Sequence, residues 1–466
     1  MVDRPPAQTL ETRGLLDPAH DWKSLFRRPE FHEPVIDGVR ALAICWVFGF
    51  HLLYFHVGSF TSEVRALFAN PWLQWISRGD LGVDLFFVIS GFLIGSILFT
   101  EIRESTGINL KRFYLRRFVR LTPVYLVAMA LGLYFLHNVP KEAVLREFPP
   151  WGYAENMWAN ILYVNNFLSF DQQYMSWCWS LAIEEQFYLL APALILLFIG
   201  RGRGRIRYLV LLLSLSGFIR LAISLKYDLQ PPFRDLPNSA KFIKRFNVEY
   251  MNLYSRYAGL LAGVIGSYLM CCRKESVNHF FARTWAINTL CIMSFIVIYP
   301  IATTPTSSPL FDRLTPFMGR LWYTHHRDVF SILVMFLILA AINSPALIAV
   351  ALRRFLSWKA FFPIAQISYS AYLLHEMFML WLFPKTAYLL RDTFGAYGTI
   401  AVASVIVALM TFGGASVLYA LVEKPSMRVR SHPAIRRLWT SEPEEPPREE
   451  NAGVTGLGRQ PRGSRS

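Results

Sequence analysis

Two ionisable side chains stand inside the first long apolar run of the chain, Ile36–His56, which reads IDGVRALAICWVFGFHLLYFH. An ionisable residue near the centre of a bilayer costs on the order of 2.5–3.5 kcal/mol, so the presence of both Arg40 and His51 points to a function. Eleven helical positions amount to about three turns plus 20°, so both side chains point the same way, about 16 Å apart along the axis. This separation is too long for an ion pair, and it predicts instead that both residues line one cavity. A histidine in that cavity could act as a general base, because its unperturbed pKa lies near 6.5.

Carboxylates near the starts of two later apolar runs are candidate partners for this histidine. Asp84 lies in RGDLGVDLFFVISGF, and Glu184 and Glu185 lie in WSLAIEEQFYLL. Asp84 or Glu184 could orient His51, and Glu185 could contact the substrate. The alternative is structural, because an acidic residue in the first turn of a helix is favoured by the helix dipole.

Three arginines follow the second apolar run in the segment FYLRRFVRLTPVY. Arg116 and Arg120 are four positions apart and share a helix face, and Arg117 flanks it. Guanidinium groups so placed could hold a multiply phosphorylated ligand by bidentate hydrogen bonds. Coenzyme A carries a pyrophosphate and a ribose phosphate and would fit. The alternative is membrane topology, because basic residues are common at the cytoplasmic ends of spans.

Further candidates lie in the second half of the chain. Arg256, in YSRYAGLLAG, is expected to face inward and to contact a carboxylate or the substrate. Tyr372 and His375, in ISYSAYLLHEMF, are three positions apart and are neighbours on a helix, although His375 could equally be a buried histidine with satisfied hydrogen bonds. His325 and His326 are predicted to lie in a loop and are given no role.

Composition indicates what kind of scaffold positions these residues. The chain is 54% hydrophobic and only 17% charged, which is unusual for a soluble protein of 466 residues. Its apolar runs are about 18–22 residues long, the length that crosses a bilayer core of roughly 30 Å. The sequence therefore predicts an all-α fold, a polytopic transmembrane helical bundle of about ten spans. The spans are predicted to begin near Ile36, Leu81, Val119, Ser180, Tyr208, Tyr250, Trp285, Val329, Phe361 and Gly395.

The distribution of charge predicts how the chain is oriented. If the N-terminus is inside, the inner segments carry roughly twice as many Lys and Arg as the outer ones, so both termini are predicted to be cytoplasmic, in a plasma-membrane protein. The predicted divisions are a cytoplasmic N-terminal segment (1–35), a transmembrane domain (36–425) and a disordered cytoplasmic tail (426–466) rich in Pro, Glu, Arg and Gly. The net charge of +15 follows the loops, so no nucleic-acid partner is expected. The five cysteines show no metal-ligand spacing, and we expect no metal and no bound cofactor.

Taken in order, these segments resemble acyltransferase family three, the integral membrane acyltransferases that include bacterial O-antigen acetylases. The matching segments, from about Ile36 to Pro425, are IDGVRALAICWVFGFH, GDLGVDLFFVISGF, FYLRRFVRLTPVY, WSLAIEEQFYLL, ISYSAYLLH and LVEKPSM. The resemblance implies transfer of an acyl group, expected to be acetyl, from acyl-CoA to a hydroxyl of a carbohydrate or a cell-envelope glycan such as lipopolysaccharide. The alternative is a transporter or flippase of a glycan or lipid precursor, because intramembrane charges also mark substrate paths.

On this hypothesis each group of candidates has a role. The predicted catalytic residues are His51, Arg40, Asp84 and Glu184. His51 would act as general base on the acceptor hydroxyl or transiently carry the acyl group, and an arginine would stabilise the oxyanion. Arg116, Arg117 and Arg120 are predicted to bind the donor, and Glu185, Arg256, Tyr372 and His375 are predicted to bind the substrate.

Overall fold

The computed structural model describes most of the chain as helices joined by loops. The described residues are 17–29, 33–56, 60–70, 72–104, 107–137, 154–198, 206–233 and 239–431, and no β-strand occurs among them. The all-α fold class predicted from the sequence is therefore confirmed. The α-helices are α1 (Pro18–Ser24), α2 (Pro34–His56), α3 (Thr61–Ala69), α4 (Leu81–Glu104), α5 (Leu110–His137), α6 (Met157–Ile161), α7 (Trp179–Phe198), α8 (Ile206–Lys226), α9 (Ala240–Arg245), α10 (Leu253–Cys272), α11 (Lys274–Phe281), α12 (Thr284–Thr303), α13 (Pro316–Asn343), α14 (Leu347–Leu356), α15 (Phe361–Leu418) and α16 (Lys424–Ser431).

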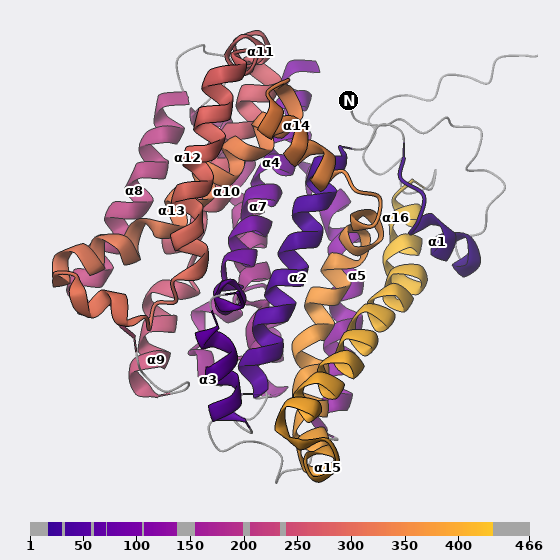
Figure 1. Cartoon of the computed structure of the whole chain (residues 1–466). Coiled ribbons are helices and arrows are strands. Elements are labelled where there is room, and N and C mark those ends of the chain that lie inside the picture. Colours follow the sequence, from indigo (N-terminus) through magenta and orange to yellow (C-terminus); the bar gives the residue numbers. More distant parts are fainter. Residues whose placement is uncertain are drawn as a thin grey trace, which may run out of the picture.

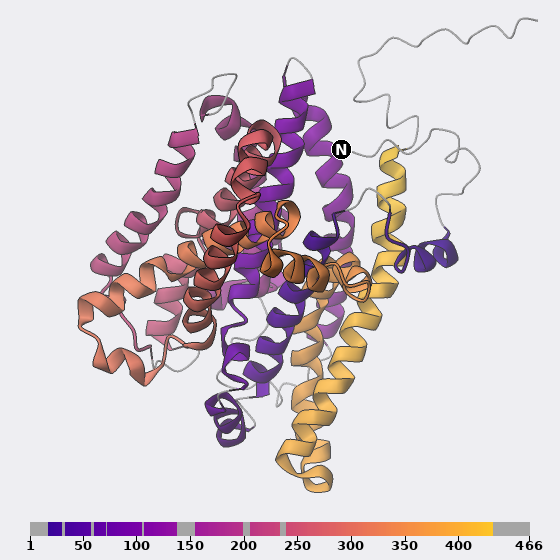
Figure 2. The same cartoon turned by 45° about the horizontal axis from the view of Figure 1, so that its top comes forward.

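The long helices form a polytopic membrane bundle. Eight helical segments in the described part of the chain are long and apolar enough to cross a membrane, and they contain α2, α4, α5, α7, α8, α12, α13 and α15. Helix α15 doubles back as two legs that lie side by side (Figures 1 and 2), because Gly395 interrupts it with φ 64° and ψ −179°, a conformation that favours glycine. Counting the two legs of α15 separately gives nine candidate spans among the described residues, close to the about ten that the sequence predicts. The span predicted from near Tyr250 corresponds to the 20-residue α10, which is not among these candidates.

Helices α4 and α10 form the centre of the bundle. The apolar part of α4 is 72% buried, more than in the other candidate spans. A Cβ atom added at Gly91 of α4 would lie 1.8 Å from the carbonyl oxygen of Leu260, and one added at Gly263 of α10 would lie 2.1 Å from that of Val88. The two backbones therefore approach so closely that only glycine fits at these positions, as is common between membrane helices.

Two predicted span boundaries are wrong. The third span was expected from Val119, but α5 already begins at Leu110, so the three arginines Arg116, Arg117 and Arg120 lie within the helix. The eighth was expected from Val329, but α13 begins at Pro316 after the Thr315 side chain, which accepts a hydrogen bond from the Met318 amide. His325 and His326 are therefore helical and do not lie in a loop. In both cases the helix begins with polar turns that precede the apolar run.

The two ends of the described chain meet at one end of the bundle, where α1 lies beside α16 (Figures 1 and 2). The buried Asp21 of α1 forms a bidentate pair with Arg428 of α16, in which Nη1 lies 2.7 Å and Nη2 lies 2.5 Å from the two carboxylate oxygens. Residues 426–431, predicted to be disordered, are helical. Residues 1–16 and 432–466 lie outside the described residues.

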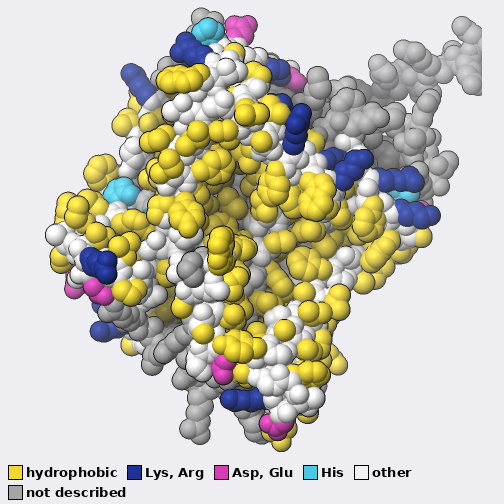
Figure 3. Space-filling model, in the orientation of Figure 1, with side chains coloured by type: hydrophobic (Ala, Val, Ile, Leu, Met, Phe, Trp, Pro, Cys, Tyr) yellow, Lys and Arg dark blue, Asp and Glu magenta, His cyan; other side chains and the backbone are white. Residues whose placement is uncertain are grey.

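The surface agrees with a membrane bundle. Hydrophobic side chains cover the middle of the face shown in Figure 3, whereas Lys and Arg gather at the end that carries α1, α11 and α14. An apolar belt with a basic end is the arrangement expected of a multi-pass membrane protein.

Candidate functional site

Two cavities inside the bundle divide the candidate residues between them. The large cavity has a volume of about 430 Å³ and the small cavity one of about 110 Å³. Val83 and Tyr372 line both, so these two side chains form the wall between the cavities. His51 lines the large cavity and Arg40 the small one, so the prediction that they line one cavity is wrong. Eleven residues of α2 place them at different depths, on opposite sides of this wall.

His51 belongs to a compact polar group formed by α2 and α15. His51 Nδ1 lies 3.1 Å from Nε2 of the fully buried His375, whose Nδ1 lies 2.6 Å from the carbonyl oxygen of Tyr372. A carbonyl can only accept, so Nδ1 of His375 carries a hydrogen, and in a neutral His375 Nε2 accepts a hydrogen bond from His51 Nδ1. On the other side of the ring, His51 Nε2 lies 3.2 Å from Glu376 Oε1. The network therefore leaves Nε2 of His51 as the nitrogen that can exchange a proton at the cavity wall.

The same three side chains have the composition of a metal site. One ligand atom each from His51, His375 and Glu376 can be chosen so that all three lie within 4.8 Å of one another. Two imidazoles and a carboxylate are ligands that suit zinc. The two hydrogen bonds of His375 and the contact between His51 Nε2 and Glu376 already give each ring nitrogen of the two histidines a polar neighbour, so the group can also serve as a proton-transfer network.

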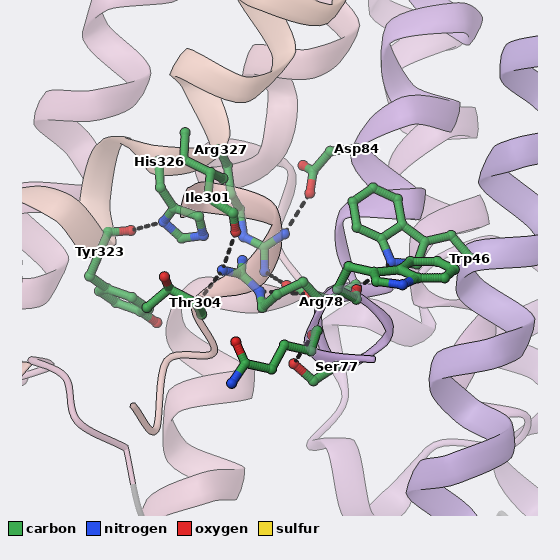
Figure 4. Close-up of polar contacts among 12 residues, drawn as sticks. Trp46, Ser77, Arg78, Asp84, Ile301, Thr304, Tyr323, His326 and Arg327 are labelled. Atoms are coloured by element: carbon green, nitrogen blue, oxygen red, sulfur yellow. Dashed lines mark hydrogen bonds and ion pairs between the residues drawn. The ribbon is translucent and has the colours of Figure 1, made fainter. Parts of the chain in front are cut away.

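A second buried network, drawn in part in Figure 4, contributes Arg78, Asp80 and Arg327 to the lining of the large cavity. Arg327 of α13 pairs with both Asp80 and Asp84, and Arg256 of α10 lies 3.2 Å from Asp84. Arg78 Nε lies 3.1 Å from Asp80, and its Nη1 donates to the carbonyl oxygens of residues 301 and 304, both at 2.8 Å. Burial would raise the pKa of the Asp80 carboxyl, but Arg78 and Arg327 outweigh burial and hold that pKa well below its usual range. These ion pairs tie α4, α10 and α13 together around the cavity.

The small cavity gathers charges of both signs. Its ionisable lining consists of Arg40, Arg117, Arg120, Glu184, Glu185 and Glu423, with Tyr163, Tyr188, Tyr369 and Tyr372. The Arg117 guanidinium stacks on the ring of Tyr188 at 4.1 Å, and the Tyr188 hydroxyl donates to Glu184 at 2.7 Å. Arg116 is not part of this lining, so the structure brings together two of the three arginines.

The structure brings some of the residues predicted from the sequence together and separates others. His51, His375 and Tyr372 meet at the wall between the cavities. Neither Asp84 nor Glu184 contacts His51, contrary to the prediction that one of them orients it, because Asp84 pairs with arginines and Glu184 accepts from Tyr188. Arg256 is such a partner of Asp84, as expected of an inward-facing arginine, and it does not line either cavity.

Several site residues were not identified from the sequence. Glu376 directly follows His375 and could have been found as a second ionisable residue within an apolar run. Arg78 ends a short helix, Gln74–Arg78, and Asp80 directly precedes α4, where ordinary capping explains both equally well. Arg327 lies inside α13, in the polar stretch that precedes its apolar part. His326 is buried, its ring stacks on Trp322 at 4.4 Å, and it lines neither cavity.

The fold and this site define a multi-pass membrane protein with a buried histidine–carboxylate group at the wall between two cavities. The family model described as an acyltransferase domain matches residues 33–419, and the chain belongs to acyltransferase family three. This confirms the resemblance seen in the sequence.

Individual relatives match over shorter stretches. The "Nose resistant to fluoxetine protein 6" of Caenorhabditis elegans is 27% identical over 377 residues, which cover 74% of this chain and 44% of that protein. "Peptidoglycan O-acetyltransferase OatA" of Listeria monocytogenes is 37% identical over 175 residues, covering 36% of this chain and 24% of the relative. "O-acetyltransferase OatA" of Staphylococcus aureus is 35% identical over 176 residues, covering 36% and 25%. The matched part is thus less than half the length of each relative, and no solved structure matches the chain.

Proposed function

We propose that this chain is a membrane O-acetyltransferase that moves an acetyl group from acetyl-CoA to a hydroxyl of a cell-envelope carbohydrate. The observation that carries the proposal is the position of His51, which lines a cavity of about 430 Å³ and whose Nδ1 lies 3.1 Å from His375 Nε2. Family membership supports acyl transfer, and two relatives carry the name O-acetyltransferase.

The large cavity suits the acceptor. Its aromatic lining offers rigid faces against which a sugar ring can pack, and its charged residues can hydrogen-bond to hydroxyls. The aromatic lining includes Phe50, Tyr54, Trp177, Trp179, Phe242, Phe246 and Tyr250. Because one relative is named for peptidoglycan, a peptidoglycan fragment is the first acceptor to test.

The small cavity suits the donor. Arg40, Arg117 and Arg120 supply positive charge there, and the phosphates of acyl-CoA are the matching anions. With both termini cytoplasmic, as the basic segments predict, this side of the wall faces the compartment that contains acyl-CoA.

Transfer then takes place at the shared wall. His51 Nε2 removes the proton of the acceptor hydroxyl, and the hydroxyl oxygen attacks the thioester carbonyl carbon. The C–S bond breaks as the ester C–O bond forms, and the proton passes to the coenzyme A sulfur. Glu376, which lies 3.2 Å from His51 Nε2, stabilises the imidazolium in between.

Radiolabelled acetyl-CoA tests this function. The full-length protein in liposomes, supplied with the label and a soluble peptidoglycan fragment, should form an alkali-labile acetyl ester on the fragment and release one coenzyme A per ester. Liposomes without protein are the control. Movement of the fragment across the bilayer without release of coenzyme A would instead show a transporter and refute the proposal.

A further inference from the structure

A third cavity lies at the end of the bundle where α1 meets α15 and α16. It has a volume of about 320 Å³ and is lined by His20, Lys23, Ser24, Arg27, Pro29, Phe362, Gln366, Tyr419 and Lys424. Lys23, Arg27 and Lys424 are cationic, and none of the described residues that line the cavity carries a carboxylate. This basic cavity therefore suits an anion.

The wall supplied by the N-terminal segment is held in place. The buried pair of Asp21 and Arg428 fixes α1 to α16, and Leu25, directly after α1, is only 2% exposed. Arg28 Nε lies 3.3 Å from the buried Asp37 of α2. These contacts make the basic cavity part of the folded structure, although α1 and Lys424 lie outside the stretch 33–419 that the family model covers.

One face of α15 connects the basic cavity with the other two. Gln366 lines both the basic and the small cavity, just as Tyr372 lines both the small and the large one. The α15 residues that line the three cavities follow one another at intervals of three or four, the spacing of a single helix face. They are Phe362, Gln366, Tyr369, Tyr372, Glu376 and Leu380. From Phe362 to Leu380 this stripe is about 27 Å long at a rise of 1.5 Å per residue.

Building on the proposed function, we infer that the basic cavity binds the ribose phosphate of the donor's nucleotide. Coenzyme A carries three phosphoryl groups at one end of a long thin arm, with the acyl group at the other. With the ribose phosphate among Lys23, Arg27 and Lys424, the pyrophosphate lies toward Arg117 and Arg120 of the small cavity. The arm then follows α15 to Tyr372, where the thioester meets the acceptor.

The test combines two ligands with two forms of the protein. Binding of coenzyme A and of dephospho-coenzyme A, which lacks only the ribose phosphate, is measured by calorimetry on the full-length protein in phosphatidylcholine nanodiscs. The parent should bind coenzyme A at least about tenfold more tightly than dephospho-coenzyme A, as expected for charge-assisted hydrogen bonds to one phosphate. The variant Lys23→Ala/Arg27→Ala should lose most of this difference and leave binding of dephospho-coenzyme A unchanged. Both residues are exposed, so the substitutions spare the core. Lys274→Ala, an exposed lysine on α11 outside the cavity, is the matched control.

The outcomes separate this site from the proposed function. A double variant that still distinguishes the two ligands as the parent does would overturn the inference, even if acetyl transfer occurs. The inference also fails if phosphatidylglycerol in the nanodiscs abolishes the parent's preference for coenzyme A over dephospho-coenzyme A, since the basic cavity would then hold the phosphate of a lipid headgroup. If the ligand difference behaves as expected but no acetyl group is transferred, the nucleotide site stands and the proposed function fails.

Discussion

The sequence predicts that Asp84 is catalytic, but its position in the structure changes the effect that its mutation should have. It accepts from Arg256 and Arg327 inside the bundle and does not contact His51. Replacement by asparagine keeps the shape of the side chain but removes the charge. Arg327 retains Asp80, whereas Arg256, only 2% exposed, is left without a carboxylate partner in the described structure. We therefore expect Asp84→Asn to act first on stability.

The magnitude follows from the geometry. At 3.2 Å and an effective dielectric constant near 20, the attraction between Arg256 and Asp84 is about 5 kcal/mol, an upper limit because desolvation opposes it. Removing one partner of a buried pair typically costs about 3–5 kcal/mol, which is the expected loss in the free energy of unfolding for Asp84→Asn. Arg256→Met leaves Asp84 paired with Arg327 and loses mainly cation–π contacts with Tyr250 and Trp179, worth about 1–2 kcal/mol. In the double variant no buried charge lacks its partner, so it should be more stable than Asp84→Asn alone.

Equilibrium unfolding of the four proteins in mixed micelles, with increasing dodecyl sulfate, measures these differences. Acetyl transfer is measured on the same samples and normalised to the folded fraction. The structure indicates that Asp84 and Arg256 are energetically coupled. If the losses in unfolding free energy of the two single variants add up to that of the double variant, this coupling is absent. If Asp84→Asn retains full stability but loses transfer, the carboxylate acts in the reaction, as the sequence first suggested.

Three further predictions concern the cavity walls. If His51 is the base, His375→Phe should lower kcat by a factor on the order of 10²–10⁴ with KM for acetyl-CoA unchanged, because His51 loses the contact that fixes its tautomer. A change in KM alone, measured by steady-state kinetics, would contradict this. Tyr372→Ala joins the large and small cavities, so release of free coenzyme A without acceptor should rise above that of the parent, and an unchanged rate in a thiol assay would argue against the shared wall. Because Arg78 and Arg327 hold the pKa of Asp80 low, this carboxylate stabilises the fold above its unfolded pKa of about 3.9 and less as the pH falls below it. Between about pH 4 and pH 2 the free energy of unfolding of Asp80→Asn should therefore fall less than that of the parent. An equally steep fall in both proteins would refute this.

The fold could be predicted largely because a bilayer restricts the choice of structure. Apolar runs of span length in the sequence correspond to the helices, including the turn at Gly395 that was predicted as a span boundary. The boundaries that failed, at Leu110 and Pro316, lie where a helix begins with polar residues. Helix α1 was not predicted, because it is short and is held by a tertiary contact, the ion pair between Asp21 and Arg428.

The sequence identified individual residues of the site better than it predicted which of them lie in contact. An ionisable residue in a membrane span is informative by itself, which is why Arg40, His51 and His375 could be found. Which charges meet depends on helix rotation and packing, and these are fixed by close contacts such as the one at Gly91. The sequence therefore could not show that Asp84 pairs with arginines, nor that Glu376 is the carboxylate beside His51.

The most direct test of the account is acetyl transfer by His51→Gln beside the control His326→Gln. Both replace a histidine inside the bundle, but only His51 lines a cavity of the site. At equal amounts of folded protein in liposomes, we expect His51→Gln to transfer no radiolabelled acetyl group to the acceptor and His326→Gln to transfer it like the parent. Transfer by His51→Gln at the parent's rate would contradict the central claim that the reaction takes place at this histidine.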